Sequence, residues 1–200
     1  MIAIIDYGAG NLFSVKNALD FLGEPNIITA DKGELARADG LILPGVGAFP
    51  DAMSMLTAGG LLDTVREQAR QKPFLGICLG MQLLFAKGYE FEETDGLGLI
   101  DGSVVKIQAP GLRIPHIGWN RLERLNDCPL LDGLSDDEYV YFVHSFRADC
   151  ADDCVAAYCD YGERIPALVF RGHIFGAQFH PEKSGETGLQ ILRNFGELLK

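Results

Sequence analysis

The chain is organised around the stretch Pro73-Phe74-Leu75-Gly76-Ile77-Cys78-Leu79-Gly80-Met81-Gln82-Leu83-Leu84-Phe85. An apolar run typical of a buried strand ends at Cys78, and a helical pattern of apolar residues begins directly after it. Gly76 and Gly80 lie two residues before and two residues after the cysteine. This is the G-x-nucleophile-x-G elbow with cysteine in place of serine, whose sharp turn crowds backbone against backbone and requires small flanking residues. The pattern predicts a strand, a tight turn at Cys78 and a helix.

Such an elbow makes Cys78 a candidate nucleophile. At the N-terminus of a helix, the macrodipole favours the thiolate, which is the reactive form of cysteine. The backbone N–H of Leu79, directly after it, is placed to donate a hydrogen bond to an oxyanion. The alternative is a buried cysteine that packs as a small hydrophobic side chain, as free cysteines usually do.

The bulk composition is that of a globular protein. Two hundred residues, 48% hydrophobic and 22% charged, suit a single domain over residues 1–200. The net charge is −11 and no Lys/Arg cluster is longer than two residues, so we expect no nucleic-acid ligand. No apolar run approaches the roughly 18 residues of a membrane span, and residues 1–6 predict a first strand rather than a signal peptide.

The cysteines indicate a compartment but no metal site. Their number is odd, five, which favours a reducing cytoplasm. Cys150, Cys154 and Cys159 follow a C-x3-C-x4-C spacing that matches neither common zinc arrangement, and no histidine follows nearby. We therefore expect ordinary thiols there, no metal and no cofactor. The chain also has no phosphate-cradling glycine loop for an ammonia acceptor.

Strand and helix patterns alternate through the first half of the chain, which predicts a largely parallel sheet with helices on both faces. The loops after Asp6, Leu43 and Ile77 would then meet at one edge, where sites gather in such sheets. The expected strands are Ile2–Asp6, Asn26–Thr29 and Gly40–Leu43, and the expected helices are one from Asn11 closed by Gly23, then Pro50–Leu56 and Leu61–Gln71.

The second half is rich in strands with little helix between them, so we expect antiparallel additions to the sheet. Gly172-His173 is a two-residue hairpin signal, and from Ser184 the tail repeats apolar residues at helical spacing. The expected strands are Val104–Ile107, Leu122–Leu125, Tyr139–His144, Val155–Tyr161, Ala167–Arg171 and Ile174–Phe179.

A cysteine nucleophile needs a base, and the base needs an orienting group. Among the four histidines, His180 follows an expected strand directly, and Glu182 lies two residues further on. The carboxylate of Glu182 is close enough in sequence to hold the His180 ring. A loop histidine is often only solvent-exposed, but together with the Cys78 elbow the pair predicts a Cys-His-Glu triad.

These motifs resemble the class I (triad) glutamine amidotransferases, which release ammonia from glutamine. The resemblance rests on Gly76–Gln82 with His180–Glu182, and it implies a flavodoxin-like three-layer α/β sandwich with a mostly parallel central sheet. Pro44-Gly45-Val46-Gly47 resembles the loop that completes the oxyanion hole in that family. Val46 N–H would then be the second donor beside Leu79 N–H.

Further stretches resemble the branch of this family that serves histidine biosynthesis and delivers ammonia to a (β/α)8-barrel cyclase subunit. The resemblance runs nearly end to end, and one departure is Phe146, where a tyrosine is expected. The stretches are Asp6–Asn11, Pro44–Phe49, Pro115–Asn120, Tyr141–Ser145 and His180–Ser184.

The same resemblance assigns roles outside the triad. Alternatives from the residues alone are a solvent-facing helix position for Gln82, a core histidine for His144 and a core residue for Trp119, the only tryptophan. The implied glutamine-binding residues are Gly47, Gln82, His144, Ser145 and, by a variable spacing, Glu90; the implied cyclase contacts are Asn11, Trp119, Tyr141 and Lys183.

Two other functions stay open at this stage. One is a glutaminase that serves a different synthase, such as the pyridoxal phosphate or anthranilate systems, and the stretches 6–11 and 115–120 discriminate against it. The other is a non-catalytic interaction subunit with the same fold, against which the intact Cys78, His180 and Glu182 argue. A resting carbonyl in the oxyanion site would make the glutaminase dormant until a partner binds.

Overall fold

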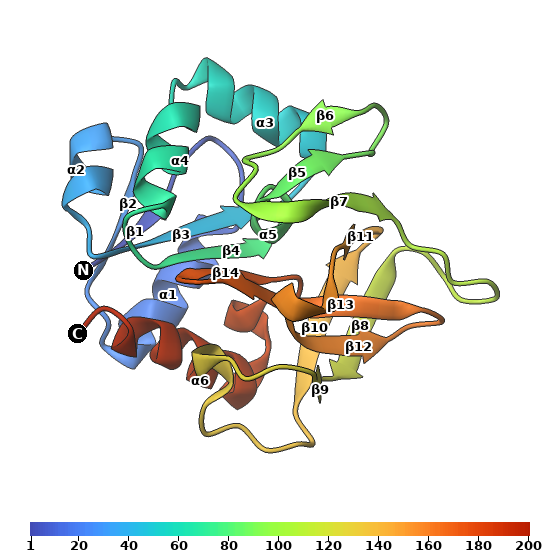
Figure 1. Cartoon of the computed structure of the whole chain (residues 1–200). Helices are drawn as coiled ribbons and strands as arrows, with labels where there is room; N and C mark the ends of the chain where they lie inside the picture. The colour runs from blue at the N-terminus through green and yellow to red at the C-terminus, as the bar shows by residue number, and fades with distance from the viewer.

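A computed structural model describes residues 1–200, and an eight-stranded sheet forms its centre (Figure 1). Five neighbouring strands are parallel and the last three are antiparallel. The fifth parallel strand comes from the second half of the chain, where antiparallel strands were expected, because it pairs directly with the strand that ends at Cys78. In spatial order the strands are β2 (Asn26–Thr29), β1 (Ile2–Ile5), β3 (Gly40–Gly45), β4 (Phe74–Cys78), β14 (Ile174–Ala177), β13 (Arg164–Arg171), β12 (Val155–Asp160) and β9 (Glu123–Arg124).

Helices cover both faces of this sheet and complete three layers (Figure 1). Side chains of β1 alternate between the two cores: Ile2 and Ile4 pack with the first pair of helices, and Ala3 and Ile5 with the other three. None of the helices is long and apolar enough to cross a membrane. The first pair is α1 (Leu12–Leu22) and α6 (Gly185–Glu197), and the other three are α2 (Lys32–Arg37), α3 (Phe49–Ala58) and α4 (Leu62–Ala69).

The strand-rich second half only partly joins this sheet, which corrects the expectation of simple additions to it. Inward residues of the two-stranded sheet, such as Val140 and Phe142, cover the same core as α6, so this sheet packs as a separate layer. The two-stranded sheet is β8 (His116–Arg121) with β10 (Tyr139–His144), and a four-stranded sheet has the order β11 (Phe146–Asp149), β7 (Ile100–Lys106), β5 (Phe85–Gly88) and β6 (Thr94–Asp95).

The helix after Cys78 is only one turn long, α5 (Leu79–Gln82), where the apolar pattern predicts a longer one. The next backbone groups are bonded to a different segment: Leu97 N–H donates to the Leu83 carbonyl at 2.8 Å. Leu83, Leu84 and Phe85 are all fully buried, so the run is apolar on every side rather than amphipathic. A single turn also has a weaker macrodipole than the predicted helix, so the dipole contributes less at Cys78.

Strand β3 continues two residues beyond its predicted end at Leu43. Pro44 and Gly45, which the sequence places in a loop, extend the strand because Gly45 pairs with Cys78 at the end of β4. β1, β3, β4 and β14 therefore all end at one edge of the sheet. The short 3-10 segments are Pro129–Leu131, Asp152–Cys154 and Pro181–Lys183.

Candidate active site

The elbow has the strained backbone that its sequence predicts. Cys78 has φ 54° and ψ −110°, a conformation that non-glycine residues rarely adopt and that costs on the order of 1–3 kcal/mol. A Cβ atom at Gly80 would lie 1.8 Å from the Leu43 carbonyl oxygen, and one at Gly76 would lie 2.5 Å from the Gly80 oxygen. Both glycines are therefore required by the close approach of β3, β4 and α5.

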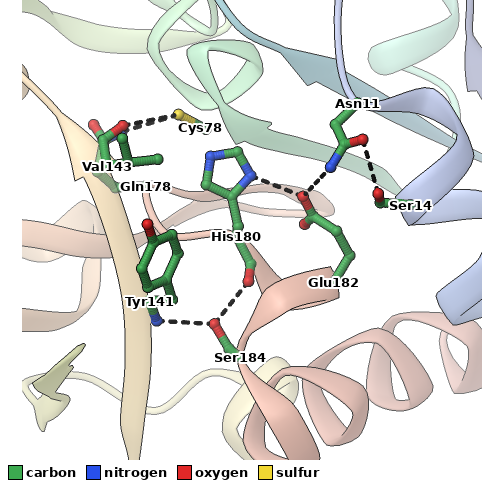
Figure 2. A network of polar contacts seen from close by, with 9 residues as sticks. All are labelled: Asn11, Ser14, Cys78, Tyr141, Val143, Gln178, His180, Glu182 and Ser184. Atoms are coloured by element: carbon green, nitrogen blue, oxygen red, sulfur yellow. Dashed lines mark hydrogen bonds and ion pairs between the residues drawn. The ribbon is translucent and has the colours of Figure 1, made fainter. Parts of the chain in front are cut away.

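His180 and Glu182 lie beside this elbow because β14 is the parallel neighbour of β4, with Ala177 opposite Ile77. Glu182 Oε1 is 2.8 Å from His180 Nδ1, and the Glu182 side chain is fully buried. Figure 2 shows the His180 ring between the Cys78 thiol and the Glu182 carboxylate. The structure thus brings the three predicted triad residues together in the predicted order.

The charge state of His180 is set by opposing effects. Burial lowers the pKa of the imidazole, but hydrogen bonds to Cys78 and Glu182, reinforced by their negative charge, outweigh it and raise the pKa to about 9. The raised pKa favours the imidazolium form of His180 near neutral pH, which places a positive charge beside the sulfur of the candidate nucleophile.

Hydrogen bonds from three elements fix the loop that carries His180 (Figure 2). The His180 N–H donates to the Tyr141 carbonyl at 3.0 Å. The Ser184 hydroxyl accepts from Tyr141 N–H at 3.0 Å and donates to the His180 carbonyl at 2.7 Å. Asn11 Nδ2 approaches Glu182 Oε1 at 3.4 Å, and Asn11 Oδ1 accepts from the Ser14 hydroxyl at 2.8 Å. The imidazole is thus held through its ring and through its backbone.

A cavity of about 280 Å³ opens at the thiol and the imidazole. All the residues that the resemblance assigns to glutamine binding and to the oxyanion hole line it. They are Val46, Gly47, Leu79, Gln82, Glu90, His144 and Ser145, joined by Cys78, Pro115, Val143, Phe146 and His180.

Gln82 has its amide nitrogen engaged and its oxygen available. Nε2 donates to the Phe146 carbonyl and to Gln178 Oε1, both at 3.0 Å. Gln178 in turn approaches Cys78 Sγ through its own Nε2 at 3.9 Å. Gln178 is not among the predicted site residues, although a glutamine inside the apolar run Ile174–Phe179 is a signal of a buried polar contact.

His144 has no free ring nitrogen for a ligand. Nδ1 lies 2.8 Å from the Phe146 carbonyl, which can only accept, so Nδ1 carries the proton, and Nε2 lies 2.9 Å from His116 Nδ1. Burial lowers the pKa of His144 to about 3, so the ring is neutral. The hydrogen bond from Nδ1 to the Phe146 carbonyl holds the Ser145–Phe146 backbone in place at the cavity wall.

Glu90 approaches the cavity from the loop after β5. Its Oε2 accepts from Phe49 N–H, the first residue of α3, at 2.8 Å, which holds the carboxylate at the cavity wall. A fixed negative charge at this position suits the ammonium group of an amino-acid ligand.

The four predicted cyclase contacts are linked through local contacts: Asn11 Nδ2 approaches Glu182, the neighbour of Lys183, and Tyr141 N–H donates to the Ser184 hydroxyl. Trp119 on β8 is 54% exposed and stacks edge-on against Tyr141 on β10, its partner in the register, with ring centroids 6.0 Å apart. Lys183 is exposed beside Glu182, and Asn11 is half-buried. Trp119 is therefore a surface residue and not a core residue.

The clustered cysteines stay free thiols, and no group of histidine, cysteine and carboxylate side chains converges as metal ligands do. Cys159 is fully buried on β12, whereas Cys150 and Cys154 are half-buried near the 3-10 segment before it.

The chain is similar to known proteins along nearly its whole length. Residues 3–198 match the family described as glutamine amidotransferase class-I. The chain is 53% identical over 196 residues to imidazole glycerol phosphate synthase subunit HisH of Bacillus cereus, covering 98% of this chain and 93% of that one. HisH of Bacillus thuringiensis is 52% identical with the same coverage.

Among solved structures, a putative GMP synthase component from Thermoplasma acidophilum superposes with a TM-score of 0.74 at 25% identity, over 99% of this chain and 92% of that chain. The fold, the matched length and the level of identity agree with one another. The chain belongs to the class I glutamine amidotransferase family.

Proposed function

We propose that this chain is the glutaminase subunit of an imidazole glycerol phosphate synthase. It hydrolyses glutamine to glutamate and ammonia and passes the ammonia to a (β/α)8-barrel cyclase subunit. The cyclase makes imidazole glycerol phosphate and aminoimidazole carboxamide ribotide in histidine biosynthesis. The observation that carries the chemistry is the ordered chain from Cys78 through His180 to Glu182, with Cys78 and His180 at the wall of one cavity.

The first half-reaction is acyl transfer to sulfur. The Cys78 thiolate attacks the side-chain amide carbon of glutamine, and the carbonyl oxygen becomes an oxyanion. His180 gives its Nε2 proton to the departing nitrogen, so ammonia leaves as the C–N bond breaks and a glutamyl thioester remains. Glu182 keeps Nδ1 protonated through the 2.8 Å contact, which holds Nε2 toward the reacting atoms.

The second half-reaction regenerates the thiol. His180 is neutral once it has lost its proton, so it accepts one from a water molecule as that water attacks the thioester. The tetrahedral intermediate collapses, glutamate leaves, and thiolate and imidazolium are restored.

Substrate placement follows from the polar groups at the cavity wall. Gln82 Oε1, which makes no hydrogen bond within the protein, accepts from the substrate amide, and the Ser145 and His144 backbone binds the carboxylate. Glu90 takes the ammonium group. Gly47 lines the cavity and has φ 99°, a conformation that residues with a Cβ rarely adopt. Because glycine has no side chain, the substrate can approach the loop closely there.

The oxyanion hole is incomplete in the resting chain. Leu79 N–H is one donor, and the second is Val46 N–H after its peptide has turned toward the cavity. Val46 is 47% exposed and Gly47 contacts nothing at its Cβ position, so the turn breaks few packing contacts. Partner and acceptor ligand favour the turned state, which makes hydrolysis conditional on the complex.

The complex is a heterodimer in which the exposed face of β8 and β10 receives the cyclase. Trp119 and Tyr141 form its aromatic centre, with Asn11 and Lys183 beside them. The whole chain, residues 1–200, acts as one domain of this complex. The five free cysteines suit a reducing cytoplasm.

The test is glutamate release by the chain alone, with the cyclase subunit, and with the cyclase and its ribonucleotide ligand. We expect slow turnover in the first case and stimulation in the last. Cys78→Ala abolishes turnover by at least about a thousandfold, whereas Cys154→Ala, a matched loss of a thiol outside the cavity, retains it. Hydrolysis that survives Cys78→Ala would contradict the mechanism, and equal rates with and without the cyclase would contradict the partnership.

A further inference from the structure

Tyr7 is an unexplained polar side chain beneath the oxyanion loop. It follows β1, is 6% exposed, and its hydroxyl has no hydrogen-bond partner in the protein. Burying a hydroxyl without a partner is costly, and a phenylalanine would fill the same space without that cost. Burial, and then the nearby Cys78, raise the pKa of Tyr7, so the hydroxyl stays a donor throughout the neutral range.

The direction of the Gly45 carbonyl follows from the β3–β4 ladder. Leu41 N–H donates to the Pro73 carbonyl at 3.0 Å, so the polar backbone groups of Leu41 face β4. Alternate residues of a strand turn these groups to the same side, and the register continues unbroken to Gly45 opposite Cys78. The Gly45 carbonyl therefore points toward β4 and the start of α5, into the region where the oxyanion donors are needed.

Turning this peptide reverses that direction. When Val46 N–H turns toward the cavity, the Gly45 carbonyl, on the same peptide, turns away from β4 and toward the β1 side of β3. Tyr7 comes from the loop after β1, and a Cβ built on Gly45 would lie 2.8 Å from the Tyr7 hydroxyl and 2.8 Å from Gly80 N. The orphan hydroxyl thus lies over Gly45, on the face of β3 that α5 covers, within reach of a carbonyl that has turned out of the β3–β4 ladder.

We propose that Tyr7 is a positioning residue for the oxyanion loop, whose hydroxyl donates a hydrogen bond to the Gly45 carbonyl in the activated state. The resting chain leaves this donor unsatisfied, and the turned peptide satisfies it. The hydroxyl thereby shifts the loop toward the conformation that presents Val46 N–H to the substrate. This inference rests on the proposed function, because it concerns the activation of glutamine hydrolysis.

The test is Tyr7→Phe in the chain reconstituted with its cyclase partner and the ribonucleotide ligand. We expect kcat for glutamine hydrolysis to fall about five- to tenfold, the effect of one hydrogen bond, while KM for glutamine stays unchanged. In the isolated chain, loss of an unsatisfied hydroxyl raises the midpoint of thermal unfolding by about 2–4 °C. Tyr158→Phe is the matched control, because its hydroxyl bonds Glu123 on the far edge of the sheet.

Alkylation of Cys78 by iodoacetamide separates this role from a direct effect on the nucleophile, because alkylation needs no oxyanion hole. We expect the Tyr7→Phe variant to react within about twofold of the wild-type rate. A parallel fall in alkylation and kcat would overturn the inference, since Tyr7 would then act on the thiolate. Full stimulation of Tyr7→Phe would also overturn it. If the wild-type complex itself showed no stimulation, the proposed function would fail instead.

Discussion

At Cys78 the chain holds a side chain in a backbone conformation that only its neighbours make tolerable. The strain is maintained because β3, β4 and α5 meet there at distances that exclude any Cβ at Gly76 or Gly80. The elbow therefore depends as much on the two glycines as on the cysteine. The exposure of the Cys78 thiol at the turn therefore depends on the packing of β3, β4 and α5 around it.

The glycine requirement gives a stability prediction. In Gly80→Ala the new methyl group overlaps the Leu43 carbonyl, 1.8 Å away, so strand and helix must separate. We expect a loss of about 3 kcal/mol or more in the free energy of unfolding, measured by denaturant titration. Gly33→Ala in α2 is the control, because its Cβ meets only side-chain atoms, the nearest Asp31 Oδ1 at 3.1 Å. Equal stability of the two variants would contradict the steric account.

The raised pKa of His180 gives a pH prediction. A group whose pKa is higher in the folded state stabilises the fold fully below its ordinary value of 6.5, and this contribution is lost as pH rises through about 9. Cys78→Ala removes the sulfur that helps to raise this pKa while burial remains, so the pKa of His180 falls and the loss of stability moves to lower pH. Titration of the imidazole by NMR measures the shift, with Cys154→Ala as control. An unchanged pKa in Cys78→Ala would show that the thiol does not hold the charge.

At the scale of elements, the β10 strand is bonded directly to the loop that carries His180. Ser184 links Tyr141 N–H to the His180 carbonyl, and His180 N–H donates back to Tyr141. The backbone of β10 therefore contacts the triad loop, while β8 and β10 together carry the aromatic pair of exposed Trp119 and half-buried Tyr141. A change in the position of β10 would therefore move the His180 loop directly, because no other element lies between them.

Removing this link tests the coupling. Ser184→Ala leaves Tyr141 N–H without an acceptor and the His180 carbonyl with only Lys183 N–H, so we expect a loss of about 1–2 kcal/mol in the free energy of unfolding. Because the imidazole is then less well positioned, kcat falls on the order of tenfold with KM for glutamine unchanged. Steady-state kinetics check this, with Ser135→Ala in an exposed loop as control. Destabilisation without a change in kcat would show that Ser184 serves the fold alone.

Much of the fold could be predicted at this scale, because local patterns determine it. The bounds of β2 and β10 agree with the prediction, as do the two-residue connection at Gly172-His173 and the helix after Ser184. The length of α5 could not be predicted, because its end is determined by backbone bonds to residues near Leu97, which lie far along the chain. The two smaller sheets could not be predicted for the same reason, because each strand pairs with a strand that lies far away in the sequence.

The candidate site, like the fold, could be predicted only in part from the sequence. The triad and the cavity residues could be named from motifs, because their chemistry requires particular residue types at fixed spacing. Gln178 and the His116–His144 pair were not identified as supports, because a buried hydrogen bond depends on which strands become neighbours. Tyr7 lies inside a motif, yet its lack of a partner is visible only in three dimensions.

At the scale of the whole molecule, β10 connects the cavity, which Val143 and His144 line, with the aromatic pair of Tyr141 and Trp119 that we propose as the centre of the cyclase interface. Trp119 is 54% exposed and contributes little to the core. We expect Trp119→Ala to weaken binding of the cyclase about 10- to 100-fold, as loss of a central aromatic anchor does, with no change in the midpoint of thermal unfolding. Titration calorimetry against the isolated cyclase measures the affinity.

The matched control is Phe21→Ala. Phe21 is 75% exposed, but it lies near the C-terminal end of α1, an 11-residue helix that runs away from Asn11 for roughly 16 Å. Both variants remove an exposed ring, so a general loss of apolar surface would weaken binding equally in the two. A selective effect of Trp119→Ala locates the partner at the β8–β10 face. If Trp119→Ala weakens docking alone, stimulation needs a higher cyclase concentration but reaches the wild-type maximum. A lower glutaminase rate at saturating cyclase would instead show that activation itself is lost.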